Sequence, residues 1–228
     1  MIIKTSKHTI DWTTLDSNIK TALVKVSGGA DSAIVLYMLC RYITDHHKDI
    51  AVVVHTTNDW KKPYQVKWAV KVRQWHMQQF PNIKFLEHET HQLQQGDDYI
   101  QGQAQHLQNV YDKHTQQGTH IDITLAGINA LPPSNIVFVD EKTGEKHVGP
   151  TDDRTGIQPT QGTGWFMPIR NFDKQDIAEI YKQFDLTDTL FDQTRSCEET
   201  SVEVTQNFTT HCGTCWWCQE RKWGFGRT

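Results

Sequence analysis

Two short groups of residues in this chain of 228 residues have types and spacings suited to chemistry. The first is Ser-Gly-Gly-Ala-Asp-Ser at positions 27–32, which combines two glycines, two hydroxyls and one carboxylate. The second is a set of four cysteines between positions 197 and 218. Glycine-rich turns of this kind bind phosphate groups, and clustered thiolates bind metal ions, so the two groups predict different ligands.

The segment 27–32 stands where a strand is expected to become a helix. The preceding run 22–26 is largely apolar, and Ile34, Val35, Met38 and Leu39 follow at helical spacing. Two glycines let the backbone turn with positive φ and approach an anion closely, while the amides that begin the helix point toward it. The hydroxyls of Ser27 and Ser32 add donors, so this segment predicts a phosphate-binding loop.

Asp31 is the unusual member of the loop. A carboxylate beside phosphate is repulsive unless a cation lies between them, so we assign Asp31 to Mg²⁺. The alternative is an ordinary glycine turn in which Ser and Asp only cap a helix. The residues assigned to catalysis are Ser27, Asp31 and Ser32, and the residues assigned to phosphate binding add Gly28, Gly29 and Ala30. His55, at the end of the second expected strand, is a further candidate for the nucleotide site, with a purely structural histidine as the alternative.

The elements that must position these groups alternate between strands and helices. Strands are expected at 22–26, 50–54, 83–86 and 121–125, and helices after the loop and at 63–80, 99–114 and 174–184. The second helix should bury Val66, Val70 and Met77, and Asp173 should cap the last one, whose inner face carries Ile177, Ile180 and Tyr181. This alternation predicts an α/β fold, a Rossmann-like parallel sheet with helices on both faces.

The chain departs from this alternation after the fourth strand. An exposed β-hairpin insertion is expected at about 136–148, followed by a loop at 149–164 that is rich in Gly, Pro, Thr and Gln. We therefore divide the chain into a nucleotide-binding α/β domain over 1–194 and a small cysteine-rich subdomain over 195–228.

Four of the five cysteines crowd into the C-terminal part of the chain. They are Cys197, Cys212, Cys215 and Cys218, and the two-residue gaps let the chain turn and present successive sulfurs to one tetrahedral ion. Zn²⁺ is the first choice, and an iron–sulfur cluster is the alternative with the same spacing. The tryptophans at 216, 217 and 223 are expected to pack around this metal site. Cys40, on an apolar helix face, is expected to be a buried small hydrophobe.

Composition limits the class of protein. Lys and Arg total 23 against 27 Asp and Glu, a formal charge of −4, which argues against nucleic acid or a polybasic membrane surface as the partner. No stretch reaches the roughly 18 apolar residues of a membrane span, and no secretory signal is recognisable, so we expect a cytoplasmic protein. Five cysteines are too few for a disulfide scaffold. The sequence leaves a homodimer open.

The Ser-Gly-Gly-x-Asp-Ser signature resembles that of the PP-loop ATP pyrophosphatases, the adenine nucleotide alpha hydrolase-like proteins. The resemblance implies that ATP is bound and cleaved between its α and β phosphates. An isolated cysteine, then Cys-Gly-x-Cys-x-x-Cys, then Arg221, all downstream of this loop, is similar to the 7-cyano-7-deazaguanine synthase family. Gly127 and Asn129 match that family's Gly-x-Asn stretch, and Asp153 and Arg154 partly match its substrate segment.

The resemblance implies a specific activity and specific ligands. The activity would be ATP-dependent ligation of 7-carboxy-7-deazaguanine, a deazapurine carboxylate, with ammonia to give 7-cyano-7-deazaguanine, a step of queuosine or deazaguanine biosynthesis. ATP and Mg²⁺ would act in the loop, and Zn²⁺ would be structural. Gly127 would help to bind the nucleotide, and Asn129, Asp153 and Arg154 would bind the substrate.

Two other functions stay open at this point. One is a different adenylating reaction, amidation or thiolation of another substrate such as a tRNA base, which an iron–sulfur cluster would favour. The other is a nucleic-acid-binding module with a vestigial nucleotide site, in which the tryptophans of the cysteine cluster stack on bases.

Overall fold

The structure is a computed structural model that describes residues 1–15, 17–141, 144, 146–148 and 164–228. The two substrate candidates Asp153 and Arg154, and most of the expected loop 149–164, lie outside the described residues.

Five parallel strands form the central sheet, in the order β5-β4-β3-β6-β9. Their bounds are Thr21–Lys25 (β3), Ala51–Asn58 (β4), Phe85–Gln92 (β5), Ile123–Ala126 (β6) and Trp165–Phe166 (β9). The chain adds β4 and β5 on one side of β3 and then crosses back to place β6 on the other side. In open α/β sheets, such a reversal creates a crevice at the carboxyl ends of the two strands, here β3 and β6.

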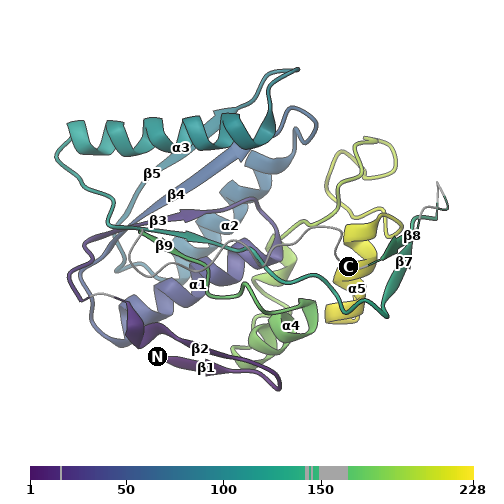
Figure 1. The fold of residues 1–228 in the computed structure, drawn as a ribbon, viewed down its shortest axis with the longest axis horizontal. Helices are drawn as coiled ribbons and strands as arrows, with labels where there is room; N and C mark the ends of the chain where they lie inside the picture. Colours follow the sequence, from purple (N-terminus) through teal and green to yellow (C-terminus); the bar gives the residue numbers. More distant parts are fainter. Residues whose placement is uncertain (16, 142–143, 145, 149–163) are drawn as a thin grey trace.

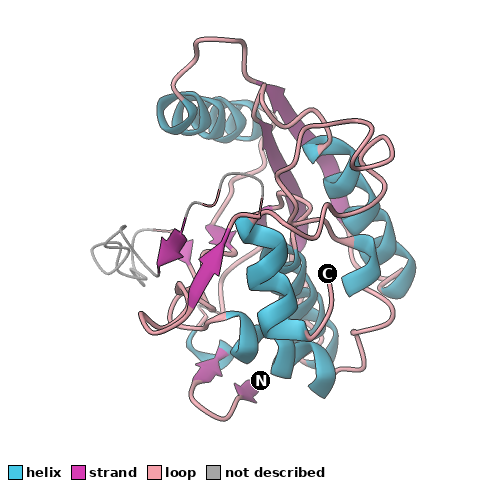
Figure 2. Cartoon of the chain, turned by 90° about the vertical axis from the view of Figure 1, so that its right-hand side faces the viewer, coloured by secondary structure: helices cyan, strands magenta, loops and turns pink. Residues whose placement is uncertain are grey.

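Helices cover both faces of the sheet, as the alternation predicts. Helices α1 (Ala30–Asp45), α2 (Gln65–Gln79) and α4 (Lys174–Gln183) lie on one face, and α3 (Tyr99–Gln116) lies on the other (Figures 1 and 2). Val24 and Val54 belong to the large core with α1, whereas Leu23 and Val53 point the opposite way and pack with α3. The predicted α/β class and parallel sheet are therefore confirmed.

Helix α1 follows the loop and is buried on most of its surface. All four apolar residues predicted to face the core are buried, as is Cys40. Burial raises the pKa of the Cys40 thiol, which keeps it protonated. The prediction of a small buried hydrophobe at this position is confirmed.

Helix α2 has the predicted position but not the predicted inner face. It buries Trp68, Ala69, Val72 and His76, whereas Met77 is 39% exposed. The prediction followed the aliphatic residues alone. The structure instead turns the helix so that the larger surface of Trp68 and the imidazole of His76 are removed from water.

Helix α4 and strand β5 show how boundaries differ from the sequence prediction. The carboxylate of Asp173 accepts hydrogen bonds from the amides of Gln175 and Asp176, which confirms the predicted cap of α4. The third strand was expected at 83–86, but β5 covers Phe85–Gln92. It is the edge strand of the sheet, and polar residues are typical of such strands, so its apolar pattern is weak.

The hairpin and the C-terminal helix form a layer beside α4. Strands β7 (Val137–Val139) and β8 (Lys146–Val148) pair antiparallel, which confirms the hairpin. The hairpin was expected to be exposed, and this is wrong for one of its sides. Phe138 is buried and packs edge-on against Trp216 and Trp223 of helix α5 (Trp216–Phe225).

A second hairpin, which the sequence did not predict, lies at the N-terminus. It consists of β1 (Ile2–Lys4) and β2 (Thr9–Asp11). A short 3-10 turn at Trp12–Thr14 follows β2, and another at Phe191–Gln193 follows α4. Among the described residues, no helix has the length and apolar character to cross a membrane.

Candidate functional site

The loop 27–32 connects β3 to α1 at the crevice between β3 and β6. Gly28 has φ +87°, and a Cβ there would lie 2.6 Å from the Cβ of Trp68, so both its backbone and its surroundings require glycine. The hydroxyl of Ser32 accepts a hydrogen bond from the amide of Ser27 at 3.1 Å and donates one to the carbonyl of Gly29, also at 3.1 Å. These two hydrogen bonds tie the two ends of the loop together.

Gly127 follows β6 and presses directly on the start of α1. A Cβ at Gly127 would lie 2.6 Å from both the carbonyl carbon of Asp31 and the amide nitrogen of Ser32. The first turn of α1 is therefore fixed between the end of β6 and the loop, and its amides stay at the carboxyl edge of the sheet. Those first amides of a helix have no intrahelical acceptor and suit an anion.

A cavity of about 220 Å³ opens beside the loop. Ser27, Gly29 and Asp31 line it, together with Asn129, which the sequence placed in the site. Most of its other walls come from later parts of the chain. These lining residues, which sequence reasoning did not identify, are Lys62, Tyr64, Lys174, Arg195 and Glu220.

Lys174 gives the cavity a fixed positive charge. The residue is 3% exposed; its ammonium donates to the carboxylate of Asp31 and lies 3.6 Å from Glu220 Oε2. Burial alone would lower the pKa of Lys174, but the two carboxylates outweigh it and the net pKa is raised. The ammonium therefore stays charged beside the loop.

This ion pair changes the expected surroundings of Asp31. The sequence assigned Asp31 to Mg²⁺, and the structure places Lys174 on its Oδ2 atom. Its Oδ1 atom is buried and has no hydrogen-bond partner among the described residues. One carboxylate oxygen thus already faces a cation, and the other is free to meet one.

A sequence signal for Lys174 existed, although no motif marks it. The residue is the first of α4, where the positive end of the helix dipole opposes a cation. Such a conflict between local preference and position is typical of functional sites. The backbone of α5 fixes the residue from behind, since a Cβ at Gly224 would lie 2.5 Å from the Cβ of Lys174.

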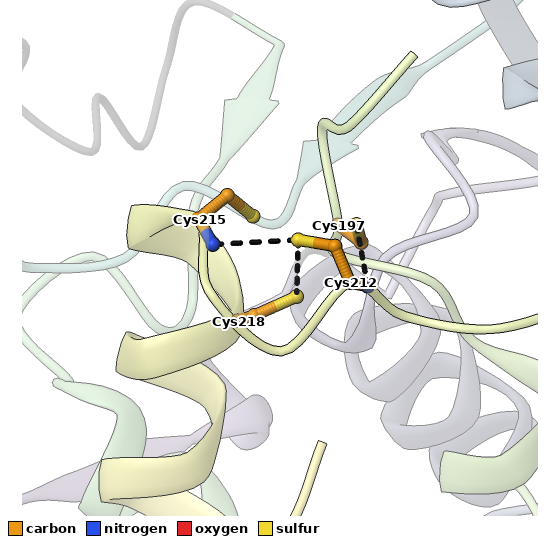
Figure 3. A group of neighbouring side chains, drawn as sticks. All are labelled: Cys197, Cys212, Cys215 and Cys218. Atoms are coloured by element: carbon orange, nitrogen blue, oxygen red, sulfur yellow. Dashed lines mark hydrogen bonds between the residues drawn. The ribbon is translucent and has the colours of Figure 1, made fainter. Parts of the chain in front are cut away.

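The four C-terminal cysteines come together in one cluster (Figure 3). Their sulfur atoms all lie within 4.8 Å of one another, and those of Cys212 and Cys218 are 3.9 Å apart. The amide of Cys212 points to the sulfur of Cys197, and the amide of Cys215 points to that of Cys212. Backbone donors of this kind stabilise thiolates, so the cluster could bind a metal.

The charges within the cluster also call for a cation. Hydrogen bonds from Cys215 and Cys218 hold the pKa of Cys197 low, and hydrogen bonds with Cys197 and then Cys215 raise the pKa of Cys218. Four thiolates this close would repel one another strongly, and a bound metal ion removes that repulsion.

The buried Arg221 braces the segment that leads into the cluster. Its guanidinium stacks on the ring of Phe191 at 3.6 Å, and it donates to the Oγ1 atom of Thr194 at 2.9 Å and to the carbonyl of Phe191 at 3.0 Å. Cys197 itself lines the cavity beside the loop. The cysteine cluster and the loop therefore share one wall.

His55 lies elsewhere. The imidazole is 1% exposed and bonds through Nε2 to Nδ1 of His106 on α3, at 2.8 Å. Burial, then the charge of His106, lower the pKa of His55 to about 3. His55 does not line the cavity beside the loop, and its packing under α3 accounts for its position.

The tryptophans of the C-terminal segment behave differently from one another. Trp216 packs on Phe138 and stands at right angles to Trp217, with ring centroids 4.1 Å apart. Trp223 also packs on Phe138, and Trp217 lines the cavity. Packing therefore accounts for the positions of Trp216 and Trp223.

No family model matches the chain, and no curated protein matches its sequence. One similar solved structure is the U34-tRNA thiolase NcsA from Methanococcus maripaludis with its [4Fe-4S] cluster. It is 11% identical, with a TM-score of 0.46, over 96% of this chain and 76% of that one. At these values the likeness says nothing of this chain's chemistry.

Proposed function

We propose that this chain is an ATP-dependent adenylating enzyme of the PP-loop class. The observation that supports this most is the loop 27–32, which presents the first amides of α1 to a cavity at the crevice between β3 and β6. The glycine at 28 is sterically required, and a buried ammonium stands at the same place. Amides, a helix dipole and a fixed cation together suit a triphosphate.

Each part of the site has a role in the proposed reaction. The amides of the loop and the hydroxyls of Ser27 and Ser32 would hold the departing phosphates. Lys174 would neutralise charge that develops on pyrophosphate. The buried Oδ1 atom of Asp31, without a hydrogen-bond partner among the described residues, fits a ligand oxygen for Mg²⁺. Bound Mg²⁺ would supply further charge neutralisation on the phosphates.

The substrate we propose is a 7-deazaguanine carboxylate, with ammonia as the second substrate. A carboxylate oxygen attacks the α phosphorus of ATP, pyrophosphate leaves, and an acyl adenylate forms. Ammonia displaces AMP to give the amide. A second ATP activates the amide oxygen in the same way, and loss of AMP and a proton gives the nitrile. The site must exclude water from both adenylates during the reaction.

Asn129 is the described residue that we propose for substrate binding, because it lines the cavity together with the loop. Asp153 and Arg154 complete the proposal as substrate residues from the sequence. An arginine suits a carboxylate, because its guanidinium can donate two parallel hydrogen bonds.

We propose Zn²⁺ as the metal of the cysteine cluster. A tetrahedral site with Zn–S bonds of 2.3 Å separates its sulfurs by about 3.8 Å. The observed limit of 4.8 Å between all four sulfur atoms is close to that value. An iron–sulfur cubane places several irons and sulfides between the cysteines and needs them further apart. The compact arrangement therefore favours a single ion.

One observation favours a second candidate, a thiolation reaction on the same adenylated type of substrate. Cys197 and Trp217 line the cavity beside the loop, so a metal in the cluster would stand close to the reacting groups. A purely structural ion has no need of that position. Metal analysis of protein purified without oxygen distinguishes the candidates: zinc supports amidation, and iron with labile sulfide supports thiolation.

The activity test mixes purified protein with MgATP, ammonium and 7-carboxy-7-deazaguanine. The expected products are AMP, pyrophosphate and the nitrile, and mass spectrometry detects them. Amide without nitrile would indicate an enzyme that stops after the first adenylation. Absence of AMP and pyrophosphate with this substrate would contradict the proposed substrate.

Two variants of the same helix make the matched control. Asp31→Ala removes the carboxylate of the first turn of α1, and we expect AMP release to fall by about 100-fold or more. Asp45→Ala removes the carboxylate of the last turn, which forms an ion pair with Arg41 on the same helix. The Asp45 variant should retain activity, so equal losses in both would assign the effect to the helix rather than to the site.

A further inference from the structure

Arg195 stands between the phosphate loop and the cysteine cluster, and nothing in the proposed reaction uses it. It is 4% exposed and lines the cavity beside the loop. It precedes Cys197 by two residues, and its backbone amide donates to the carbonyl of Gly28 at 2.8 Å. One residue thus contacts the required glycine of the loop and begins the cysteine segment.

The guanidinium of Arg195 holds both flanks of the segment between the first two cysteines. Nη1 donates to the carbonyl of Thr210, two residues before Cys212, and Nη2 donates to the carbonyl of Glu199 at 3.3 Å, two residues after Cys197. The planar fork of arginine is suited to bridging two acceptors in this way. Movement of either flank must therefore move this side chain.

Aromatic rings connect the same guanidinium to the back of the loop. It lies 4.6 Å from the ring centroid of Tyr64 and 5.8 Å from that of Phe208. The carbonyl of Phe208 accepts a hydrogen bond from the indole of Trp68 at 3.0 Å. Trp68 is the side chain against which Gly28 packs. The cysteine segment therefore reaches the loop by two routes, and both include Arg195.

The charge of Arg195 is not paired within the site. Lys174 faces two carboxylates, whereas Arg195 forms no ion pair in the part of the chain that the structure describes, and its buried Nε has no hydrogen-bond partner there. Its two hydrogen bonds go to carbonyl oxygens, which carry no full charge. An anion in the cavity beside it would supply the missing compensation.

We infer that Arg195 is a positioning residue that couples nucleotide binding in the loop to metal retention in the cysteine cluster. Nucleotide phosphate in the cavity fixes the guanidinium, which fixes both flanks of the cysteine segment and slows release of the metal. If nucleotide raises the equilibrium affinity of the cluster for metal, thermodynamic linkage requires that the metal raise nucleotide affinity by the same factor. This inference rests on the proposed binding of ATP in the loop.

The test measures zinc release from the full chain. Zinc-loaded protein is mixed with excess chromogenic chelator, with and without a saturating concentration of α,β-methylene-ATP and Mg²⁺. We expect the nucleotide analogue to slow zinc release at least about fivefold, the lower end of ordinary coupling between sites. In Arg195→Gln, the rates with and without the analogue should agree within about twofold.

Arg73→Gln is the matched control. Arg73 also donates to a backbone carbonyl and lies over an aromatic ring, that of Phe85, but it does not line the cavity. This variant should keep the full effect of the analogue on zinc release. Arg195→Lys keeps the positive charge. It serves as a second variant in case Arg195→Gln does not fold. Because lysine cannot bridge the carbonyls of Glu199 and Thr210, the Arg195→Lys protein should bind the analogue, but the analogue should no longer slow its zinc release.

Three results separate the inference from its premise. If calorimetry shows no binding of the analogue to the unaltered protein, both the ATP site and the coupling are wrong. If the analogue binds but leaves zinc release unchanged, the coupling is wrong and the ATP site stands. If Arg195→Gln and Arg195→Lys keep the full effect, the coupling does not pass through Arg195.

Discussion

The proposed phosphate loop and the cysteine cluster are built in opposite ways to hold a charged ligand. The loop consists of consecutive residues, and its geometry comes from the backbone, with Gly28 at φ +87°. The cluster gathers side chains from two places in the chain, Cys197 and the segment that begins at Cys212. The backbone turn of the loop depends most on its glycine, whereas the cysteine cluster fails as a metal site when any one of its ligands is lost.

The two regions meet at charged residues that belong to neither. Lys174 of α4 contacts Asp31 in the loop and Glu220 of α5, the helix that carries Cys218. We therefore expect single substitutions to cost different amounts of stability in the loop, in the cysteine cluster and where the two regions meet.

The largest effect is expected in the cysteine cluster. Cys215→Ser removes one thiolate of four, and because structural zinc sites provide much of the free energy of folding around them, we expect a loss of about 5 kcal/mol or more. Metal content and thermal denaturation measure it. Cys40→Ala removes a thiol outside the cluster and should retain the metal; loss of metal in both variants would contradict the assignment.

The next largest effect is expected where the two regions meet. Lys174→Met leaves the carboxylates of Asp31 and Glu220 without their shared ammonium, which should cost about 3–5 kcal/mol in the free energy of unfolding. Urea denaturation measures it. Lys182→Met, at the exposed end of the same helix, should cost only a few tenths, roughly the value of a helix-dipole contact. Equal losses of unfolding free energy in the two variants would mean that the buried contacts of Lys174 with Asp31 and Glu220 do not stabilise the fold.

A smaller effect is expected in the loop itself. Gly28→Ala combines a positive φ with a clash against Trp68 and should cost roughly 2–3 kcal/mol, with a matching loss of ATP affinity. Gly118 also has a positive φ, +74°, but nothing lies within 4 Å of an added Cβ. Gly118→Ala should therefore cost only about 1 kcal/mol, and the difference between the two variants gives the cost of the clash alone.

The smallest effect concerns a region outside both sites. The pKa of His55 is lowered to about 3 in the folded protein, against about 6.5 when unfolded, so the unfolded state binds the extra proton. Stability from His55 is fully present above pH 6.5 and is lost as the pH falls toward 3. Between pH 7 and pH 5 the loss is about 2 kcal/mol.

His55→Gln should abolish that part of the pH dependence. Acid weakens the cysteine cluster equally in both proteins, so the difference between their urea denaturation curves at pH 7 and pH 5 isolates His55. Identical pH dependence in the two proteins would show that this imidazole is not buried in a neutral form.

Predictability from sequence follows the same division between local and assembled features. The loop, the cap at Asp173 and the cysteine spacing are visible because neighbouring residues determine them. Lys174 and Arg195 belong to no sequence motif, and they line the cavity although they lie far from the loop in the sequence. The predicted inner face of α2 is wrong, and the sequence does not predict the contact of Phe138 with α5. Both have the same reason, because the partner surface decides which side of an element is buried.

The most direct test of the account is a crystal structure with α,β-methylene-ATP and Mg²⁺. We predict phosphate oxygens within hydrogen-bond distance of the amides of 28–32, with Lys174 and Asp31 beside them. A triphosphate bound elsewhere, with Trp68 and the loop unchanged and no anion at the start of α1, would contradict it.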